Sequence, residues 1–249
     1  HGFAEHSSRY DYVAKKFNDA NYSVYRYDLR GHGRTKSELG HIESFQDLID
    51  DANEMVDLIK KEHKNIPVFM LGHSMGGLIT ALYGIKYPKS ITGQVFSGAA
   101  LGYLPSVEGI KKYLFLILNK FLKKTQISNP IDDSLCSVKE VFDDYISDDL
   151  VLKKASINFY VEFLIRGVES LNHGIKDYNY PCLLTHGKMD RVVPCKNSQR
   201  FYENISSIDK KIKIYDNLYH EILNEREKDQ VLEDMVQWLN QRIVSNYPI

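Results

Sequence analysis

The chain has 249 residues, of which 43% are hydrophobic and 26% are charged, and its formal net charge is −1. This composition is typical of a globular protein with one large α/β domain or two small ones, and the near-neutral charge gives no reason to expect nucleic acid as a partner. No run reaches the roughly 18 apolar residues of a membrane-spanning helix. Three cysteines without a C-x-x-C pair are too few for a disulfide framework and favour a reducing, cytoplasmic location.

The apolar residues of the first hundred positions change their spacing several times. A period near 3.6 predicts a helix, whereas alternation or a short apolar run predicts a strand. In chain order the patterns predict a helix at 7–20 capped by its two serines, a strand at 22–28, a helix at 44–63, a strand at 67–71, a helix from 76 and a strand at 91–98. Because the sequence opens at His1 in what reads as the middle of a fold, we expect the first strands of the sheet to be missing from it.

Strand–helix alternation stops near residue 100 and resumes near 179. Apolar helices flanked by lysines, with Pro105 and Pro130 among them, fill the interval. Beyond it the patterns predict a strand at 181–187, a helix near 196–205, a strand at 211–216 and a helix at 225–244. Such alternation predicts a mostly parallel sheet flanked by helices on both faces. We therefore expect an α/β core formed by residues 1–99 and 179–249, with 100–178 inserted as a helical cap.

The stretch PVFMLGHSMGGLITALYG, at 67–84, places one serine, Ser74, between a predicted strand and a predicted helix. Gly72 and Gly76 lie two residues to either side and remove side chains that would collide in so tight a turn. In this context G-x-S-x-G is typical of a nucleophile elbow, which presents a serine hydroxyl for attack on an acyl carbon. A glycine-rich turn with a capping serine is the alternative interpretation.

A serine nucleophile needs a base to accept its proton and an acid to orient that base. In this architecture the order along the chain is Ser, acid, His, each beyond the carboxyl end of a strand. Asp190, in GKMDRVVP, and His220, in NLYHEILNE, meet both requirements. Asp216 is the competing candidate for the acid. The competing candidates for the base are His41, His63, His173 and His186.

The tetrahedral oxyanion formed in such an attack needs backbone N–H groups aimed at it. One should come from Met75, the residue after the nucleophile, at the amino end of a helix. The other should come from the loop HGFAEH at 1–6, where Gly2 allows a tight turn and Phe3 offers its N–H.

Five motifs together resemble those of the monoacylglycerol lipase and lysophospholipase group of the α/β-hydrolase superfamily. They cover the chain outside roughly 100–178, and five in this order are far more specific than one elbow. RGHG at 30–33 matches a family signature whose role is mainly structural. The motifs are HGFAEHSSRY at 1–10, DLRGHGRT at 28–35, GHSMGG at 72–77, HGKMDRVV at 186–193 and LYHEILNE at 218–225.

The resemblance implies a serine esterase that releases one fatty acyl chain from a glycerol-type ester, without a cofactor. Ser74 matches the family's nucleophile, Asp190 its acid and His220 its base, while Phe3 and Met75 match its oxyanion amides. A small-molecule carboxylesterase or a peptidase of the same fold remains an alternative, because the triad does not choose between ester and amide. A non-catalytic ligand-binding module is a further alternative. We expect no metal, since no H-E-x-x-H or comparable cluster occurs.

The segment VEGIKKYLFLILNKFLKK, at 107–124, joins an apolar centre to five lysines. As a helix it would be suited to pack over the active site as an acyl-binding lid, or to lie on an anionic lipid surface with its lysine stems snorkelling. The two roles are compatible. We therefore expect a lipid ester as substrate and contact of the cap with membranes or micelles, whereas the sequence does not indicate the oligomeric state.

Overall fold

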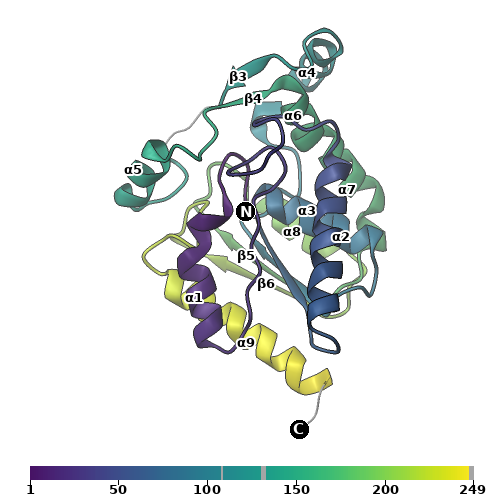
Figure 1. The fold of residues 1–249 in the computed structure, drawn as a ribbon, viewed down its shortest axis with the longest axis vertical. Coiled ribbons are helices and arrows are strands. Elements are labelled where there is room, and N and C mark those ends of the chain that lie inside the picture. The colour runs from purple at the N-terminus through teal and green to yellow at the C-terminus, as the bar shows by residue number, and fades with distance from the viewer. Residues whose placement is uncertain (108, 130–132, 247–249) are drawn as a thin grey trace.

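A computed structural model describes residues 1–107, 109–129 and 133–246 (Figure 1). Its centre is a sheet whose four strands are all parallel to their neighbours. In spatial order the strands are β1 (Phe69–His73), β2 (Gly93–Ser97), β5 (Cys182–Gly187) and β6 (Lys210–Tyr215). Their carboxyl ends therefore meet at one edge of the sheet, which is where ligands bind in folds of this kind.

Helices cover both faces of the sheet, as predicted (Figure 1). Successive side chains of a strand point to opposite faces, and accordingly Val95 and Leu183 belong to one apolar cluster, whereas Phe96 and Leu184 belong to another. The first cluster packs under α1 (Asp11–Asp19) and α9 (Lys228–Asn246). The second packs under α2 (Phe45–Glu62), α3 (Met75–Lys86), α7 (Val168–Gly174) and α8 (Lys196–Asn204).

The predicted helix at 7–20 forms, but not with the predicted cap. It opens with a 3₁₀ turn, Ser7–Tyr10, and continues as α1, and neither start has a side-chain cap. Ser7 instead donates from its backbone N–H and its hydroxyl to Asp28 Oδ1, at 2.8 and 2.6 Å. The serine therefore ties the helix start to the loop that follows residue 27.

The strand predicted at 22–28 is wrong. The segment is extended but belongs to neither sheet of the described residues. A cavity of about 770 Å³ is lined by both residues 22–27 and residues 66–71. A strand exists only through ladder hydrogen bonds to a neighbour, and across this cavity the segment has none with β1. Alternation of aromatic and β-branched residues indicates a half-buried extended segment, but it does not indicate whether a neighbouring strand is there to pair with it.

The other predicted elements occur within three residues of their expected limits. α2 begins with a capping box, in which Ser44 Oγ accepts from Gln46 N–H and Asp47 accepts from Ser44 N–H. The last helix begins at Lys228 instead of Glu225. The reason is that the buried Glu225 carboxylate accepts hydrogen bonds from the Tyr219 and Ser137 N–H groups and so belongs to the preceding turn.

Residues 100–178, called the insert below, contain several short elements. Those around α4 (Ile110–Phe121), α5 (Lys139–Ser147) and α6 (Ile157–Val161) lie over the carboxyl edge of the sheet, whereas α7 packs against one of its faces (Figure 1). Leu152 N–H donates to Ala4 O, and Glu221 N–H donates to Leu135 O, so the insert is bonded to loops of the core on both sides. Its elements before α7 are a 3₁₀ turn (Pro105–Val107), α4, β3 (Gln126–Ser128), α5, β4 (Lys154–Ser156), α6 and a π-helical turn (Glu162–Gly167), and a 3₁₀ turn (Ile175–Asp177) follows α7. Strands β3 and β4 pair antiparallel.

None of the helices in the described ranges combines the length and the apolar character needed to cross a bilayer.

β1 and α3 cross at glycines, which lets the two backbones approach closely. A Cβ on Gly72 would overlap the carbonyl oxygen of Gly76 and the hydroxyl of Thr80. A Cβ on Gly77 would overlap that of Ala99. Because backbone atoms at this crossing cannot move aside without displacing Ser74, the glycines are a condition for the turn between strand and helix.

Gly72→Ala should lower the free energy of unfolding by about 1–3 kcal/mol or more, since the added methyl must displace backbone. Gly174→Ala is the matched control, because the nearest atoms to its Cβ belong to the Ile85 side chain at 3.0 Å or more. That control should stay within about 1 kcal/mol of wild type. Urea unfolding followed by circular dichroism checks both values, and equal midpoints for Gly72→Ala and wild type would contradict the packing argument.

Candidate active site

Ser74 occupies the turn between β1 and α3, as predicted. Its backbone has φ 51° and ψ −116°, in the positive-φ region that non-glycine residues seldom occupy. Such a conformation costs about 1–3 kcal/mol and persists only where the surroundings hold it. Here Ser74 N–H donates to Ser97 O and Ala100 N–H donates to Ser74 O, both at 3.0 Å. The turn is thus fixed from the neighbouring strand.

Ser74, His220 and Asp190 form one chain of hydrogen bonds. Ser74 Oγ lies 3.0 Å from His220 Nε2, and His220 Nδ1 lies 2.7 Å from Asp190 Oδ2. The three residues follow β1, β6 and β5, so this series of hydrogen bonds spans the carboxyl edge of the sheet. The residues are 8%, 3% and 9% exposed respectively, which keeps bulk water from competing for these contacts. The sequence thus identified three side chains that the fold brings together.

Both oxygens of the Asp190 carboxylate are fully used. Oδ1 accepts from the N–H groups of Val192 and Val193, at 2.9 and 2.8 Å, while Oδ2 faces His220 and His186. Burial alone would raise the pKa of Asp190, but the two histidines outweigh it and hold the pKa well below its usual range. The carboxylate is therefore ionised at neutral pH.

Opposing effects act on the His220 imidazole. Burial lowers its pKa, but the Asp190 carboxylate, with smaller contributions from Glu221 and Glu5, raises it above the ordinary 6.5. Because Nδ1 faces a carboxylate, Nδ1 carries the proton and Nε2 of the neutral ring can accept from Ser74. The His73 ring packs beside it, with centroids 4.8 Å apart, and burial followed by the charge of His220 lowers the pKa of His73 to about 3. His73 is thus a neutral support.

The two expected oxyanion donors flank Ser74. The N–H of Met75 is at the first position of α3, where a helix offers it no internal acceptor. The N–H of Phe3 has no acceptor among the hydrogen bonds of the described residues. A Cβ on Gly2 would lie 3.1 Å from Ser74 Cβ, so the loop at 1–6 passes directly against the serine. Both donors are therefore available to a ligand.

Aromatic rings hold the Phe3 side chain. Its centroid lies 5.2 Å from that of Phe159, 5.3 Å from Tyr160 and 5.9 Å from Phe163. The His32 ring of the RGHG motif, fully buried, meets both Phe3 and Phe159, at 6.0 and 5.3 Å. The motif thus supports the loop at 1–6 from behind and does not touch the hydrogen-bonded chain, in line with the structural role expected for it.

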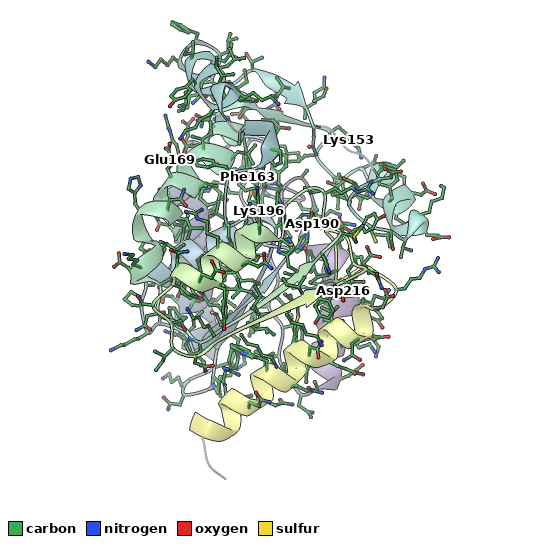
Figure 2. All side chains as sticks on the ribbon, turned by 180° about the vertical axis from the view of Figure 1, so that it is seen from behind. Lys153, Phe163, Glu169, Asp190, Lys196 and Asp216 are labelled. Atoms are coloured by element: carbon green, nitrogen blue, oxygen red, sulfur yellow. The ribbon has the colours of Figure 1, made fainter. Side chains whose placement is uncertain are left out.

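The competing candidates lie elsewhere or act differently. Figure 2 shows Asp190 beneath the insert and Asp216 towards the periphery, where its exposed carboxylate pairs with Lys188 at 2.8 Å. His186 is not the base, because its Nε2 faces both Asp190 and the Val193 carbonyl, each at 3.0 Å, and so carries a proton. The other histidines make hydrogen bonds to residues outside the Ser74–His220–Asp190 series. His41 bonds to Ser156, His63 to Tyr25 and His173 to the Glu169 carbonyl.

Three charged residues beside the triad were not singled out from the sequence. Glu5, Arg9 and Glu221 form ion pairs in which all three side chains are nearly buried. The only signal for part of this cluster was the acid–base spacing of four within HGFAEHSSRY. Glu221 follows His220 directly, but nothing local to it indicates a partner near residue 9.

Within the described ranges, no three or more His, Cys, Asp and Glu side chains are grouped so as to hold a metal ion. The expectation of catalysis without a cofactor stays a prediction. What the described groups can do is transfer a proton from a serine hydroxyl to an imidazole while two backbone N–H groups receive an oxyanion.

Comparisons with known proteins agree with this architecture. The model of the Hydrolase_4 family, described as serine aminopeptidase, S33, matches residues 1–227. The monoacylglycerol lipase of Mycolicibacterium smegmatis is 32% identical over 96% of this chain and 85% of its own length, and the monoglyceride lipase of Mus musculus is 30% identical over 98% and 82%. The crystal structure of the Paleococcus ferrophilus monoacylglycerol lipase superposes with a TM-score of 0.88 at 27% identity, covering 97% of this chain and 92% of that one. The chain therefore belongs to the Hydrolase_4 family of α/β-hydrolases and, within it, to the group of the monoacylglycerol lipases.

Proposed function

We propose that the chain is a serine hydrolase that cleaves the carboxylic ester of a lipid with a single acyl chain, a monoacylglycerol or a lysophospholipid, through an acyl-enzyme on Ser74. The observation that carries this proposal is the hydrogen-bonded chain from Ser74 Oγ to His220 Nε2 and from His220 Nδ1 to Asp190. Relatives named monoacylglycerol lipase and phospholipase support the substrate class.

In the proposed reaction, Ser74 Oγ attacks the ester carbonyl carbon as its proton passes to His220 Nε2. The resulting oxyanion accepts from the Phe3 and Met75 N–H groups. The intermediate collapses when the bond to the alcohol oxygen breaks and His220 returns the proton to that oxygen. Water, deprotonated by the same imidazole, then attacks the acyl-enzyme carbonyl. The bond to Ser74 Oγ breaks as the imidazolium returns the proton to that oxygen, and the fatty acid is released. Asp190 stays ionised throughout and stabilises the imidazolium.

An ester suits the charges near Ser74 better than a peptide with a free amino terminus does. An aminopeptidase needs a carboxylate ready to bind the substrate ammonium group. Two buried carboxylates beside the site, Glu5 and Glu221, are each already paired with Arg9, at 2.7 and 2.8 Å. A third, Glu225, already accepts hydrogen bonds from the Ser137 and Tyr219 N–H groups. A module that only binds ligands has no evident need for the intact chain of Ser74, His220 and Asp190. Both alternatives are therefore disfavoured.

The insert fits the role of a cap over this site, with 1–99 and 179–249 as the core. Its Phe159, Tyr160 and Phe163 surround the ring of Phe3, next to the expected position of the oxyanion. An acyl chain attached to the reacting carbon would extend away from the polar groups around Ser74 and contact these aromatic side chains. Burial of methylenes, at about 0.8 kcal/mol each, would then favour long chains over short ones.

α4 of the cap presents an apolar stripe to solvent, which favours contact with a lipid surface. Lys111 and Lys120 are exposed around it and would face anionic head groups, whereas Lys123 and Lys124 pair with Glu43 and Glu38. On the other side of the helix, Leu116 and Leu118 pack against α6 and the π-helical turn. The residues of the stripe are Ile110, Tyr113, Leu114, Ile117 and Phe121, from 55% to 84% exposed.

We further propose a cytoplasmic location, with the enzyme peripheral to a membrane. The three cysteines are free thiols, in agreement with a reducing compartment.

A fluorophosphonate probe should label Ser74 and no other residue, as located by mass spectrometry. Ser74→Ala should abolish labelling and turnover with an unchanged circular dichroism spectrum, and His220→Ala should reduce turnover by about three orders of magnitude or more. His186→Ala tests the competing histidine and should retain more activity than His220→Ala. Turnover that survives Ser74→Ala, or a loss below tenfold in His220→Ala, would contradict the proposed mechanism.

The acid limb of the pH profile of kcat/KM should have its midpoint above pH 6.5. His220 accepts a proton only when neutral, and its pKa is raised, so activity is lost as the pH falls through that raised value. Asp216→Asn removes the competing carboxylate, which is exposed and paired with Lys188, and should leave the midpoint in place. A midpoint below 6.5, or one that moves in Asp216→Asn, would assign the base or the acid differently.

Two double variants of α4 distinguish its role as an acyl-binding lid from its role in contact with a lipid surface. Tyr113→Ser with Ile117→Ser removes outward side chains and should weaken binding to phosphatidylglycerol vesicles about tenfold or more, with unchanged hydrolysis of a soluble acetate ester. Leu116→Ser with Leu118→Ser changes inward side chains and should reduce activity on long-chain esters more than on acetate. Sedimentation with vesicles and an ester panel measure both effects. Equal vesicle binding by the outward variant and wild type would argue against surface contact.

A further inference from the structure

A buried cluster of three charges lies beside the hydrogen-bonded chain and takes no direct part in the proposed reaction. Arg9 Nη1 donates to Glu5 Oε2 at 2.7 Å and to Glu221 Oε1 at 2.8 Å, and Arg9 Nη2 donates to Glu221 Oε2 at 2.8 Å. The side chains are 11%, 4% and 5% exposed. Arg9 thus binds one carboxylate with both arms of its guanidinium and a second with one arm.

The two carboxylates belong to the two loops that carry the proposed chemistry. Glu5 lies in the loop at 1–6, and its other oxygen accepts from Gly2 N–H at 2.5 Å and from Tyr10 OH at 2.7 Å. The Gly2 N–H is adjacent along the backbone to the proposed donor, Phe3 N–H. Glu221 directly follows His220. Arg9 therefore connects the neighbour of the oxyanion donor to the neighbour of the base.

The cluster stays ionised despite its burial. Burial alone would raise the pKa of Glu5, but the charge of Arg9 outweighs it, and the pKa is lowered to about 2. Burial would lower the pKa of Arg9, but its two carboxylates raise it instead. The Tyr145 ring of α5 covers the guanidinium at 4.6 Å and shields it from water. Charge-assisted bidentate bonds of this kind are the strongest and most directional available to side chains.

We infer that Arg9 is a positioning residue that fixes the oxyanion loop and His220 relative to each other through Glu5 and Glu221. This inference rests on the proposed function of Ser74, His220 and the Phe3 N–H. The two loops are far apart along the sequence. Their relative placement decides whether the Phe3 N–H and the His220 imidazole can act on the same ester group of the substrate. A misplacement of 1 Å at such a site reduces the rate about a hundredfold.

Stability alone does not explain this arrangement. Buried ion pairs are often no better for the fold than apolar residues of the same volume, because desolvation opposes their attraction. What an apolar cluster lacks is direction, since apolar contacts tolerate sliding. The fork of Arg9 sets both the distance and the orientation between the two loops. Its effect should therefore appear in kcat rather than in substrate binding.

The test measures kcat and KM for p-nitrophenyl butyrate in Glu221→Gln, Arg9→Lys and Arg9→Met. Glu221→Gln keeps the volume and should lower kcat about tenfold, with KM within about twofold of wild type. Arg9→Met should lower kcat about a hundredfold, and Arg9→Lys, which keeps the charge but loses the fork, should recover only part of that loss. If Arg9→Met does not fold, Glu221→Gln and Arg9→Lys decide the question.

Asp209→Asn is the matched control. Asp209 binds Arg242 through both carboxylate oxygens, but it lies just before β6, at the edge of the sheet opposite Ser74. This variant also breaks an arginine–carboxylate fork and should lower the unfolding temperature without changing kcat. If Glu221→Gln and Arg9→Lys behave like Asp209→Asn, with kcat within twofold of wild type, the cluster is structural and the inference is overturned.

Labelling by the fluorophosphonate probe separates this result from a failure of the proposed function. Wild-type protein that is not labelled at Ser74 would remove the proposed function and this inference with it. Labelling of wild type at Ser74, with normal labelling rates in Arg9→Lys and Glu221→Gln, would remove the inference alone. Slower labelling of both variants, with Asp209→Asn as fast as wild type, supports it.

Discussion

The hydrogen bond between Asp190 and His220 is the contact on which the rest of the site depends. A buried carboxylate without partners would take up a proton and lose its charge. Asp190 avoids this because two backbone N–H groups and two imidazoles use both its oxygens. Those partners come from β5 itself, which contains His186, and from the loops after β5 and β6, two strands that pair in parallel register. The pairing of β5 with β6 thus brings together the groups that keep Asp190 charged, and this charge sets the His220 tautomer.

Most of the sheet, and the three residues at its edge, could be predicted because their causes are local. Ser74 is marked by glycines that the crossing of β1 and α3 requires, and parallel strands place Asp190 and His220 at the same edge. The prediction of a strand at 22–28 was wrong because alternation is a property of one segment, whereas a ladder of hydrogen bonds needs two adjacent strands. The serine cap failed for a similar reason: Ser7 found its partner in Asp28, 21 residues away.

The buried ion pairs illustrate what a single sequence cannot contain. Arg9 and Glu221 are 212 residues apart, and no period or motif connects them. Charged residues of this type are nearly always exposed, so a sequence argument places them at the surface unless a partner is known. His186 is a similar case. Its position at the end of a predicted strand made it a competitor for the base, and only the geometry shows that it bonds to Asp190, the proposed acid.

The insert contacts the same loops that hold the proposed catalytic groups. Tyr145 covers Arg9, Leu135 accepts from Glu221 N–H, and Leu152 donates to Ala4, the residue after Phe3. In the proposed function the insert closes over the acyl chain, and from this position any movement of the insert acts on the loops of Phe3 and His220. Under this proposal, substrate choice by the insert and alignment of the reacting groups are mechanically linked, and the charged cluster around Arg9 contacts both the insert and the two loops.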